Sequence, residues 1–380
     1  MKTPSSTATR PAPSSAAAAN PARYQRHRPE ETTLYRVVQE HLDTFLAFVD
    51  IETGGAGLPT FVTDEFDAFL ACGILAHGFL RLRCNGCAEE KLVAFSCKRR
   101  GICPSCGTRR MNEAAAHLVD HVIPKVPVRQ WVLSFPIPLR SLFAVHPECL
   151  LPVLQIIHRA IATFLFNQTG QKRDQAATGA VTLIQRFGSA ANLNIHLHAL
   201  VLDGVYGNLA TTDTIDTAHP CPPAPAAPIF HAAGAPTRAA LEALLGKIIT
   251  RVLRLLTRLG HLVLEEGETY LAGCIIDPDD VMPPLQAAAA NYRIAQGPRA
   301  GQKVLSLQLG PRRPARAAES SALCANAHGF SLHAGVRCRA DDRRGLEQLC
   351  RYITRPAISN ERLSVNRAGQ SLPPRRRGWY

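Results

Sequence analysis

The chain has 380 residues, and 43 Lys and Arg against 30 Asp and Glu give it a formal net charge of +13. This length allows two domains with a substantial core, and the basic charge favours nucleic acid over a membrane as partner. The first residues are rich in Ser, Ala and Pro without an apolar signal core, and no apolar run reaches about 18 residues. These features exclude the membrane-spanning and secreted classes and predict a cytoplasmic protein.

The N-terminal part begins with a low-complexity stretch, residues 1–30, which we expect to be a disordered arm. From Tyr35 onward apolar residues recur at helical spacing up to Val49, and a second helix is expected after Thr63. These two helices lead into a cysteine cluster, so residues 31–125 are predicted to form one helical and zinc-binding domain.

The remaining residues, 126–366, show an alternation of helical and strand-like runs typical of an α+β domain. Helices are expected in this domain at 151–166, 238–259 and 341–353, after a helix at 111–122 that ends the first domain, and strands at 131–135, 181–187, 193–202, 304–309 and 330–338. The strands 181–187 and 193–202 are joined by a short connection and predict an antiparallel pair. Residues 208–237 are rich in Pro and Ala and are expected to be a linker-like insertion.

Twelve cysteines in a chain without a secretion signal indicate metal ligands rather than disulfides. Cys84 and Cys87 form one Cys-x-x-Cys pair, and Cys103 and Cys106 form a second pair that is separated from the first by fifteen residues. This spacing is typical of a structural zinc site that is closed by four thiolates. Cys97 lies between the pairs without a partner two positions away, so we interpret it as a packing or supporting thiol.

Cations surround the second cysteine pair. A hairpin that is stiffened by a metal and carries these cations can bind DNA phosphates. Four protein ligands leave the zinc no open position for a substrate, so this site is expected to be structural and not catalytic. The predicted DNA-binding residues are Lys98, Arg99, Arg100, Arg109 and Arg110.

A second candidate metal site lies in the strand-like segment 193–202. Alternation places Ile195 and Leu197 on an apolar face that packs, and Asn194, His196 and His198 on the opposite face, which is expected to look outward. Two imidazoles two residues apart on a strand can bind one divalent ion, but they are also common as ordinary polar-face histidines.

A candidate nucleophile lies in the last predicted helix. Leu346, Leu349, Cys350 and Ile353 form its buried stripe, and Tyr352 lies at the edge of that stripe. On helix position alone, Tyr352 could equally be an amphipathic residue at the edge of the core, with its hydroxyl in water.

Several long segments together resemble the HUH-type rolling-circle transposases of bacterial insertion sequences that carry an N-terminal zinc-binding domain. The resemblance runs from about Leu34 to Asn366. The matching stretches are HGFLRLRCNGC, SCKRRGICPSCGTRRM, RQWVLSFPIPLR, GAVTLIQRFGSAANLNIHLHALVLDGVY and HGFSLHAGVRCRADDRRGLEQLCRYITRPAISNERL. It implies an α+β fold with N-terminal helices and a zinc ribbon, followed by an HUH-type catalytic domain with an antiparallel sheet flanked by helices.

The resemblance also implies a mechanism. His196 and His198 match the histidine pair that holds a catalytic divalent ion, Mg²⁺ or Mn²⁺, and Tyr352 matches the nucleophile. This catalytic ion is separate from the structural Zn²⁺ of the cysteine site. Gln185 on the neighbouring strand is our choice for a third ligand. The family cleaves and rejoins single-stranded DNA through a 5′-phosphotyrosine, so single-stranded or hairpin transposon ends are the implied partner.

The sequence departs from the family in two places. Some relatives carry a second tyrosine one helical turn after the first, but here Pro356 occupies that position, so a single nucleophile or two protomers would be needed. Full-length relatives continue beyond this helix, whereas residues 367–380 form an aberrant basic tail, which indicates a truncated chain of uncertain activity.

A replication initiator or relaxase is the nearest alternative function, and a non-catalytic zinc-ribbon DNA binder is an alternative of another class.

Overall fold

The computed structural model describes residues 28–188, 192–207, 228–265, 268–272, 282–291, 293–294, 300–302, 323–358, 363–365 and 371–372. Most of the predicted N-terminal arm, the strand expected at 304–309 and most of the segments 208–237 and 367–380 lie outside these residues. The end of the expected insertion forms a short strand, β8 (Ile229–Ala232), which pairs with β7 (Gly204–Gly207).

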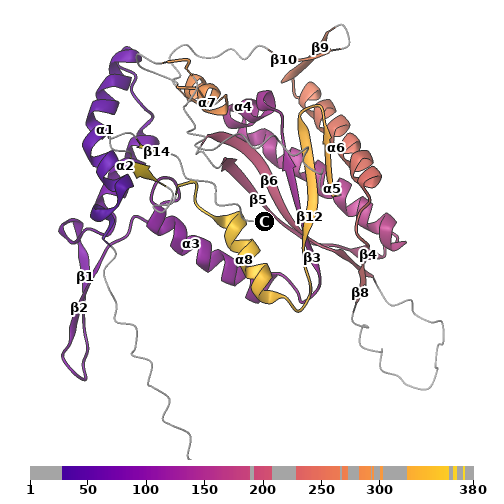
Figure 1. Cartoon of the computed structure of the whole chain (residues 1–380), viewed down its shortest axis with the longest axis horizontal. Helices are drawn as coiled ribbons and strands as arrows, with labels where there is room; N and C mark the ends of the chain where they lie inside the picture. The colour runs from indigo at the N-terminus through magenta and orange to yellow at the C-terminus, as the bar shows by residue number, and fades with distance from the viewer. Residues whose placement is uncertain are drawn as a thin grey trace, which may run out of the picture.

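The N-terminal part consists of two helices, a hairpin and a third helix (Figure 1). Thr32 accepts a hydrogen bond from the amide of Tyr35 and so caps the first helix, and the Tyr35 hydroxyl donates to the carbonyl of Leu70 in the second. The second helix begins at Thr60, earlier than expected. The elements are α1 (Thr33–Glu52), α2 (Thr60–Ala71), β1 (Phe79–Arg83), β2 (Glu90–Ala94) and α3 (Pro104–His117), with short 3₁₀ turns at Pro29–Glu31 and Leu75–His77.

The larger part is built on an antiparallel five-stranded sheet with the order β11-β12-β3-β6-β5. Most of the predicted strands are confirmed, since the strands expected at 181–187, 193–202 and 330–338 lie at those positions. The strands are β3 (Val128–Ser134), β5 (Ala180–Phe187), β6 (Leu193–Leu202), β11 (Cys324–Ala327) and β12 (Phe330–Cys338). Short strands outside this sheet are β4 (Ala176–Ala177), β9 (Leu262–Glu265), β10 (Glu268–Leu271), β13 (Ser364–Val365) and β14 (Ser371–Leu372).

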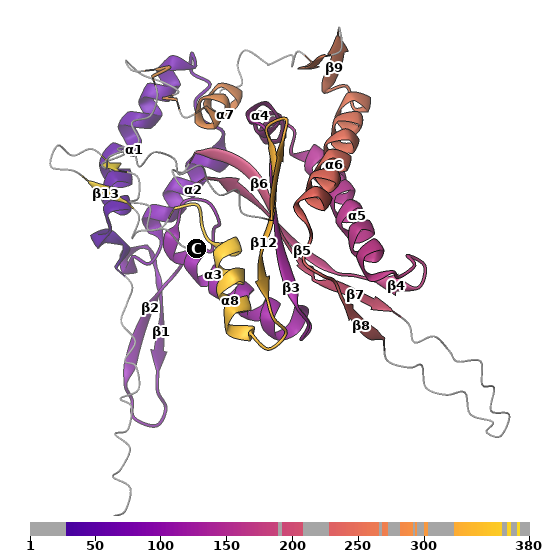
Figure 2. The same cartoon turned by 45° about the vertical axis from the view of Figure 1, so that its right-hand side comes forward.

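Helices cover both faces of this sheet (Figures 1 and 2). One face packs on α4 (Ile137–Val145), α5 (Leu150–Thr169) and α6 (Arg238–Arg258), with Ile195 and Leu197 of β6 in this core. The other face packs on α3 and α8 (Arg343–Thr354). A one-turn π-helical segment (Leu118–Val122) extends α3, a 3₁₀ turn (Pro147–Cys149) precedes α5, and α7 (Met282–Ala290) lies near α4. The predicted α+β class is therefore confirmed.

A buried ion pair joins three strands at one end of the sheet. Both oxygens of Asp203 accept hydrogen bonds from Arg129, at 2.7 and 3.0 Å, and Arg337 also donates to this carboxylate. Asp203 is 1% and Arg129 3% exposed. Because a buried charge without a partner is costly, this cluster fixes the ends of β3, β6 and β12 relative to one another.

Within the described residues, one helical segment, Pro147–Thr169, is long and apolar enough to cross a membrane by length and composition. It contains α5, whose inward side chains, among them Val153, Ile157 and Ile161, belong to the core over the sheet. Core helices of globular proteins have the same composition, so this segment is explained by its packing.

Candidate metal centre and catalytic residues

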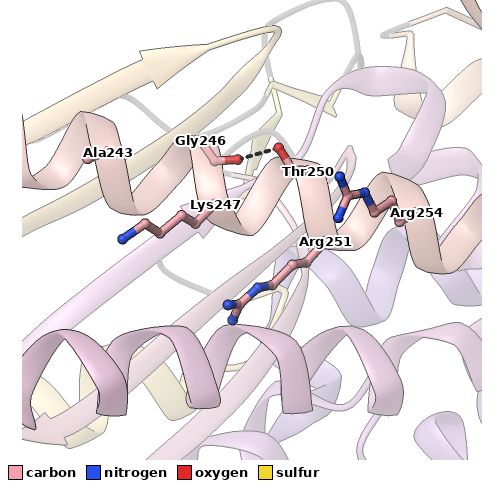
Figure 3. A pocket seen from close by; sticks show the side chains of 6 residues that line it. All are labelled: Ala243, Gly246, Lys247, Thr250, Arg251 and Arg254. Atoms are coloured by element: carbon pink, nitrogen blue, oxygen red, sulfur yellow. Dashed lines mark hydrogen bonds between the residues drawn. The ribbon is translucent and has the colours of Figure 1, made fainter.

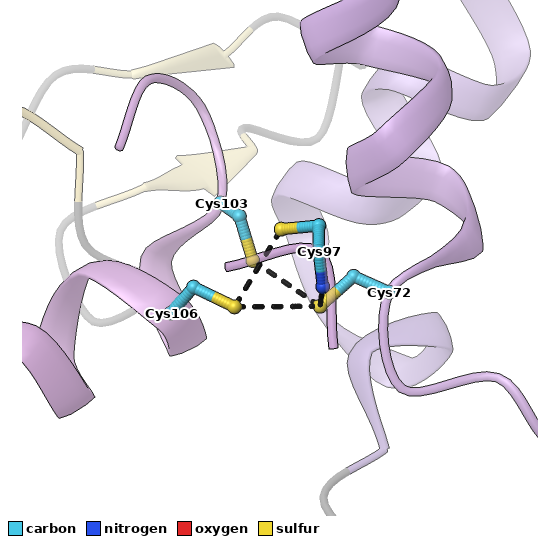
Figure 4. A group of neighbouring side chains, drawn as sticks. All are labelled: Cys72, Cys97, Cys103 and Cys106. Atoms are coloured by element: carbon cyan, nitrogen blue, oxygen red, sulfur yellow. Dashed lines mark hydrogen bonds between the residues drawn. The ribbon is translucent and has the colours of Figure 1, made fainter. Parts of the chain in front are cut away.

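Four cysteine side chains converge in the N-terminal part. The sulfur atoms of Cys72, Cys97, Cys103 and Cys106 lie within 4.8 Å of one another (Figure 4). The sulfur–sulfur distances are 3.7 Å for Cys72–Cys106, 3.5 Å for Cys97–Cys106 and 3.6 Å for Cys72–Cys103. Four thiolates bound about 2.3 Å from a zinc ion lie about 3.8 Å apart in a tetrahedron. The four sulfurs therefore fit a closed structural zinc site.

The local fold prepares these four thiols for a cation. Cys103 stands at the N-cap position of α3 and Cys106 lies in its first turn, where the helix dipole favours negative charge. The Cys97 amide donates to the sulfur of Cys72 at 3.3 Å. A hydrogen bond with Cys103 lowers the pKa of Cys72 to about 5, and burial raises the pKa of Cys97 to about 12. Thiols this close cannot all ionise without a cation between them.

The predicted zinc ligands are brought together only in part. Cys103 and Cys106 lie in the buried group, whereas Cys84 and Cys87 are exposed at the tip of the β1–β2 hairpin and are not part of it. Cys72 and Cys97 take their places. Cys97 is thus not a mere packing thiol, and Cys72 was missed because it follows a helix without a cysteine two positions away. The first pair lies at the tip of a projecting hairpin, and the second strand of this hairpin, β2, separates it in space from the second pair.

The two histidines of β6 lie side by side, with ring centroids 4.9 Å apart. The expectation that they look outward is wrong, because α8 covers this face and leaves His196 9% and His198 3% exposed. Burial lowers the pKa of His198 to about 3 and also lowers that of His196. Both imidazoles are therefore neutral near pH 7, which is the form that binds a metal ion.

Hydrogen bonds orient both imidazole rings. Nδ1 of His196 lies 2.6 Å from the carbonyl oxygen of Asn194, to which it donates in the tautomer that leaves Nε2 a lone pair. Nδ1 of His198 lies 2.8 Å from the side-chain amide nitrogen of Gln130; the amide turned by 180° accepts from Nδ1–H instead and leaves Nε2 of His198 a lone pair. Nε2 of His198 is buried and has no hydrogen-bond partner among the described residues. These are the features of imidazoles that await a ligand at Nε2.

Tyr352 lies against this histidine pair. Its ring centroid is 5.7 Å from that of His198 in an edge-to-face arrangement, and its side chain is 42% exposed. The guanidinium of Arg355 stacks over the tyrosine ring with its carbon 4.6 Å from the ring centroid. Residues from a strand and a helix that are more than 150 positions apart therefore form one site with an accessible phenol and a nearby cation.

Gln185 lies directly opposite His196 in the β5–β6 register. Its amide nitrogen donates to the carbonyl oxygens of Tyr352 at 3.3 Å and Ile353 at 2.7 Å. The side chain thus ties the end of α8 to the sheet, and its role as a metal ligand stays a prediction. On the histidine face, the side-chain oxygen of Asn194 is buried and has no hydrogen-bond partner among the described residues.

The cations predicted to bind DNA are not equally available. Arg99 approaches Asp64 at 4.0 Å and Glu65 at 3.7 Å, and Arg110 donates to the carbonyl of Lys98. Lys98, Arg100 and Arg109 are exposed.

Sequence reasoning missed a second basic surface on α6, where exposed cations recur at helical spacing. No ion pair involves these cations within the part of the chain that the structure describes, and the one acidic residue of α6, Glu242, pairs with Arg238. Figure 3 shows a shallow pocket along this helix, lined by Ala243, Gly246, Lys247, Thr250, Arg251 and Arg254. The cations of the α6 surface are Lys247, Arg251, Arg254 and Arg258.

Two family models match the chain. The model of a transposase zinc-binding domain, of the IS91 type, matches residues 37–135. The Y2_Tnp transposase model matches residues 179–371, which is just over half of the chain. No curated protein and no solved structure matches the chain.

Proposed function

Since the chain belongs to the Y2_Tnp transposase family and carries the transposase zinc-binding domain, we propose that it cleaves and rejoins single-stranded DNA through Tyr352. The observation that carries this proposal is the contact of Tyr352 with the buried, neutral His196–His198 pair. A structural tyrosine would not require two desolvated imidazoles beside it, one of them with an unpaired nitrogen.

His196 and His198 fit a divalent ion, because their Nε2 atoms are the ones left for a ligand. A bound Mg²⁺ or Mn²⁺ would neutralise charge on the non-bridging oxygens of the scissile phosphate. Gln185 beside His196 and the buried oxygen of Asn194 are the two candidates for a third ligand. The Cys72, Cys97, Cys103 and Cys106 group would hold the structural Zn²⁺.

The proposed reaction is a transesterification. The phenolic oxygen of Tyr352 forms a bond to phosphorus while the bond from phosphorus to the 3′ oxygen breaks. The phenol proton is lost, and the leaving 3′ oxygen gains a proton to become a free hydroxyl. The product is a 5′-phosphotyrosine, which keeps the phosphodiester energy for rejoining. Arg355, stacked on Tyr352, supplies positive charge beside the attacked phosphate.

An adduct assay tests this chemistry. Wild-type protein, incubated with Mg²⁺ or Mn²⁺ and end-labelled single-stranded DNA, should form an adduct that survives denaturation and carries the 5′ end of the cut strand. Tyr352→Phe should bind the same DNA without forming it, and His196→Ala should also fail. Tyr206→Phe is the matched control, because this half-buried tyrosine packs on Phe230 away from the histidines and should leave adduct formation unchanged. An adduct that persists in Tyr352→Phe would exclude the assigned nucleophile.

The α6 surface supports a second DNA contact, which we assign to duplex DNA flanking the cut strand. Single-strand binding normally adds aromatic side chains on which bases stack, and α6 contains none, whereas its cations suit phosphates. Arg251→Gln with Arg254→Gln should lower the slope of log affinity against log salt by about 2. Arg28→Gln with Arg339→Gln, both ion-paired in the structure, removes the same charge and should not lower this slope. Equal slopes for the two variants would reject the α6 surface.

The Lys98, Arg100 and Arg109 cations are proposed to contact single-stranded or hairpin ends near the zinc group. A cytoplasmic site of action on bacterial DNA is part of the same proposal.

The two alternative functions, a non-catalytic DNA binder and a replication initiator, give distinct outcomes. A non-catalytic binder would bind DNA without an adduct, and a replication initiator would require a site on replicating DNA rather than at transposon ends.

A further inference from the structure

The β1–β2 hairpin lacks a covering partner in the described part of the chain. It forms a separate two-stranded sheet that projects away from the helices and the main sheet (Figures 1 and 2). Every residue of β1 is exposed. An isolated two-stranded hairpin is marginally stable in water, so a long exposed one needs either a partner or a crosslink.

The exposed hairpin also carries apolar side chains between its charged residues. The large hydrophobic side chains exposed on it or beside it are 42–59% exposed. Leu80 and Leu82 share one face with Val93, because Leu80 lies opposite Val93 in the register. Scattered single apolar residues are ordinary on a surface, but a contiguous group indicates a binding surface. The group on this face consists of Leu80, Leu82, Val93 and Phe95, whereas Phe79 and Leu92 are exposed on the opposite face beside Arg81.

The tip of the hairpin is shaped as half of a metal site. The amide of Cys84 donates to the carbonyl of Glu89, and the amide of Ala88 donates to the carbonyl of Cys84, both at 2.9 Å. The amides of Cys87 and Gly86 donate to the sulfur of Cys84, and the two cysteine side chains interact with each other. Ala88 adopts a left-handed conformation with φ of 59°, which a non-glycine residue rarely does. The turn therefore adopts an unfavourable backbone conformation that holds the Cys84 and Cys87 thiols close to each other.

Two thiols do not complete a zinc site, which takes four protein ligands when it is structural. Among the described residues, no group of three or more metal-ligating side chains includes Cys84 or Cys87. The buried four-cysteine group is already complete. The described part of this chain therefore offers no further ligand to this pair, and a two-fold axis through the ion would supply the same pair again.

We propose that two copies of this chain dimerise through their β1–β2 hairpins around one shared zinc ion, held by Cys84 and Cys87 of each copy. The apolar side chains of the two hairpins cover one another around the metal. The dimer has a consequence that rests on the proposed function. Each chain offers one tyrosine at the site, since Pro356 stands one turn after Tyr352, and two copies would bring the two nucleophiles needed to cut both ends of an element.

Zinc content and mass, measured together in the presence of a reductant, test the dimer. Wild-type protein should be a dimer with about 1.5 zinc ions per chain, one in each buried group and one shared. Cys84→Ser with Cys87→Ser should give a monomer with about one zinc per chain. Cys324→Ser, which alters a half-buried thiol outside both groups, is the control and should match the wild type in mass and zinc. Light scattering and elemental analysis on the same fractions give both values.

Several results would overturn the proposal. A wild-type monomer would do so at any zinc content, and so would a dimer that keeps its mass and 1.5 zinc ions per chain in the double variant. A dimer that disappears with reductant alone would be a disulfide product. Leu80→Ser with Leu82→Ser should weaken the dimer, and if it leaves the dimer intact but weakens DNA binding, the hairpin serves DNA instead. None of these outcomes depends on adduct formation by Tyr352, which is scored separately with short single-stranded DNA.

Discussion

The identity of the buried zinc ligands can be decided by one pair of substitutions. We expect Cys97→Ser to lose about one zinc ion per chain, because the Cys97 sulfur is 3.5 Å from that of Cys106, near the tetrahedral edge of about 3.8 Å. Cys84→Ser is the matched control. It removes a thiol that the sequence spacing also favoured but that lies exposed at the hairpin tip, and it should cost at most the shared half equivalent.

The energetic effect of Cys97→Ser should be large. Structural zinc contributes about 10–16 kcal/mol in small zinc-finger peptides, which matches or exceeds the whole net stability of a typical domain, about 5–15 kcal/mol. Cys72, Cys103 and Cys106 belong to the same small core as Tyr35 of α1 and Phe69 of α2. Loss of the ion should therefore unfold the N-terminal part and leave the main sheet folded.

The assay combines elemental analysis with limited proteolysis. Cys97→Ser should release zinc and expose α1 and α2 to protease, whereas Cys84→Ser should keep the wild-type pattern in that region. If Cys97→Ser keeps all its zinc while Cys84→Ser loses a full equivalent, the ligand set expected from spacing is right and the structural grouping is refuted.

Two further substitutions test the sheet and the tyrosine helix. Asp203→Asn should lower the free energy of unfolding by about 3–5 kcal/mol, because it leaves buried arginine charge uncompensated. Asp341→Asn, which alters an exposed ion pair, should change it by less than about 1 kcal/mol. Equal changes for the two variants in chemical denaturation would refute the buried network. Gln185→Ala should slow adduct formation by up to about 100-fold through misplacement of Tyr352, with an unchanged dependence on Mg²⁺ concentration. A strongly raised Mg²⁺ requirement would instead identify Gln185 as a metal ligand.

Local periodicity was sufficient to predict most of the main sheet and helices. The strand 193–202 alternates between apolar and polar residues, and the helix at 341–353 shows its buried stripe, so both were placed within two residues. The exposure of the histidine face was not predictable in the same way. Alternation separates two faces of a strand, but it does not say whether a helix from more than 140 residues later covers the polar one.

Ligand spacing was less reliable for the cysteines. A Cys-x-x-Cys pair guarantees that two thiols can meet one ion, but it does not determine which distant thiols complete the set. Cys103 and Cys106 lie in one group, as their spacing predicts, and the other members of the group depend on how α2 and the strand β2 return to the start of α3. Cys72 gives no local signal at all, because it is a single cysteine at the end of a helix.

Helix α3 connects the four-cysteine group to α8, the helix that carries Tyr352. This helix begins at Cys103 and Cys106, and a side chain at Gly107 would collide with Pro356, just beyond α8. The Thr354 hydroxyl contacts the carbonyl of Met111 at 3.4 Å. Further along, Ala115 of α3 packs in the same core as residues of α8, and Ile358 after α8 packs against the small core that contains Cys72, Cys103 and Cys106. A strand-cleaving tyrosine must be held within about an ångström of its phosphate, and α8 packs on a helix that begins at the four-cysteine group. If the proposed function holds, we therefore expect loss of zinc to slow adduct formation by Tyr352 as well as to destabilise the N-terminal part.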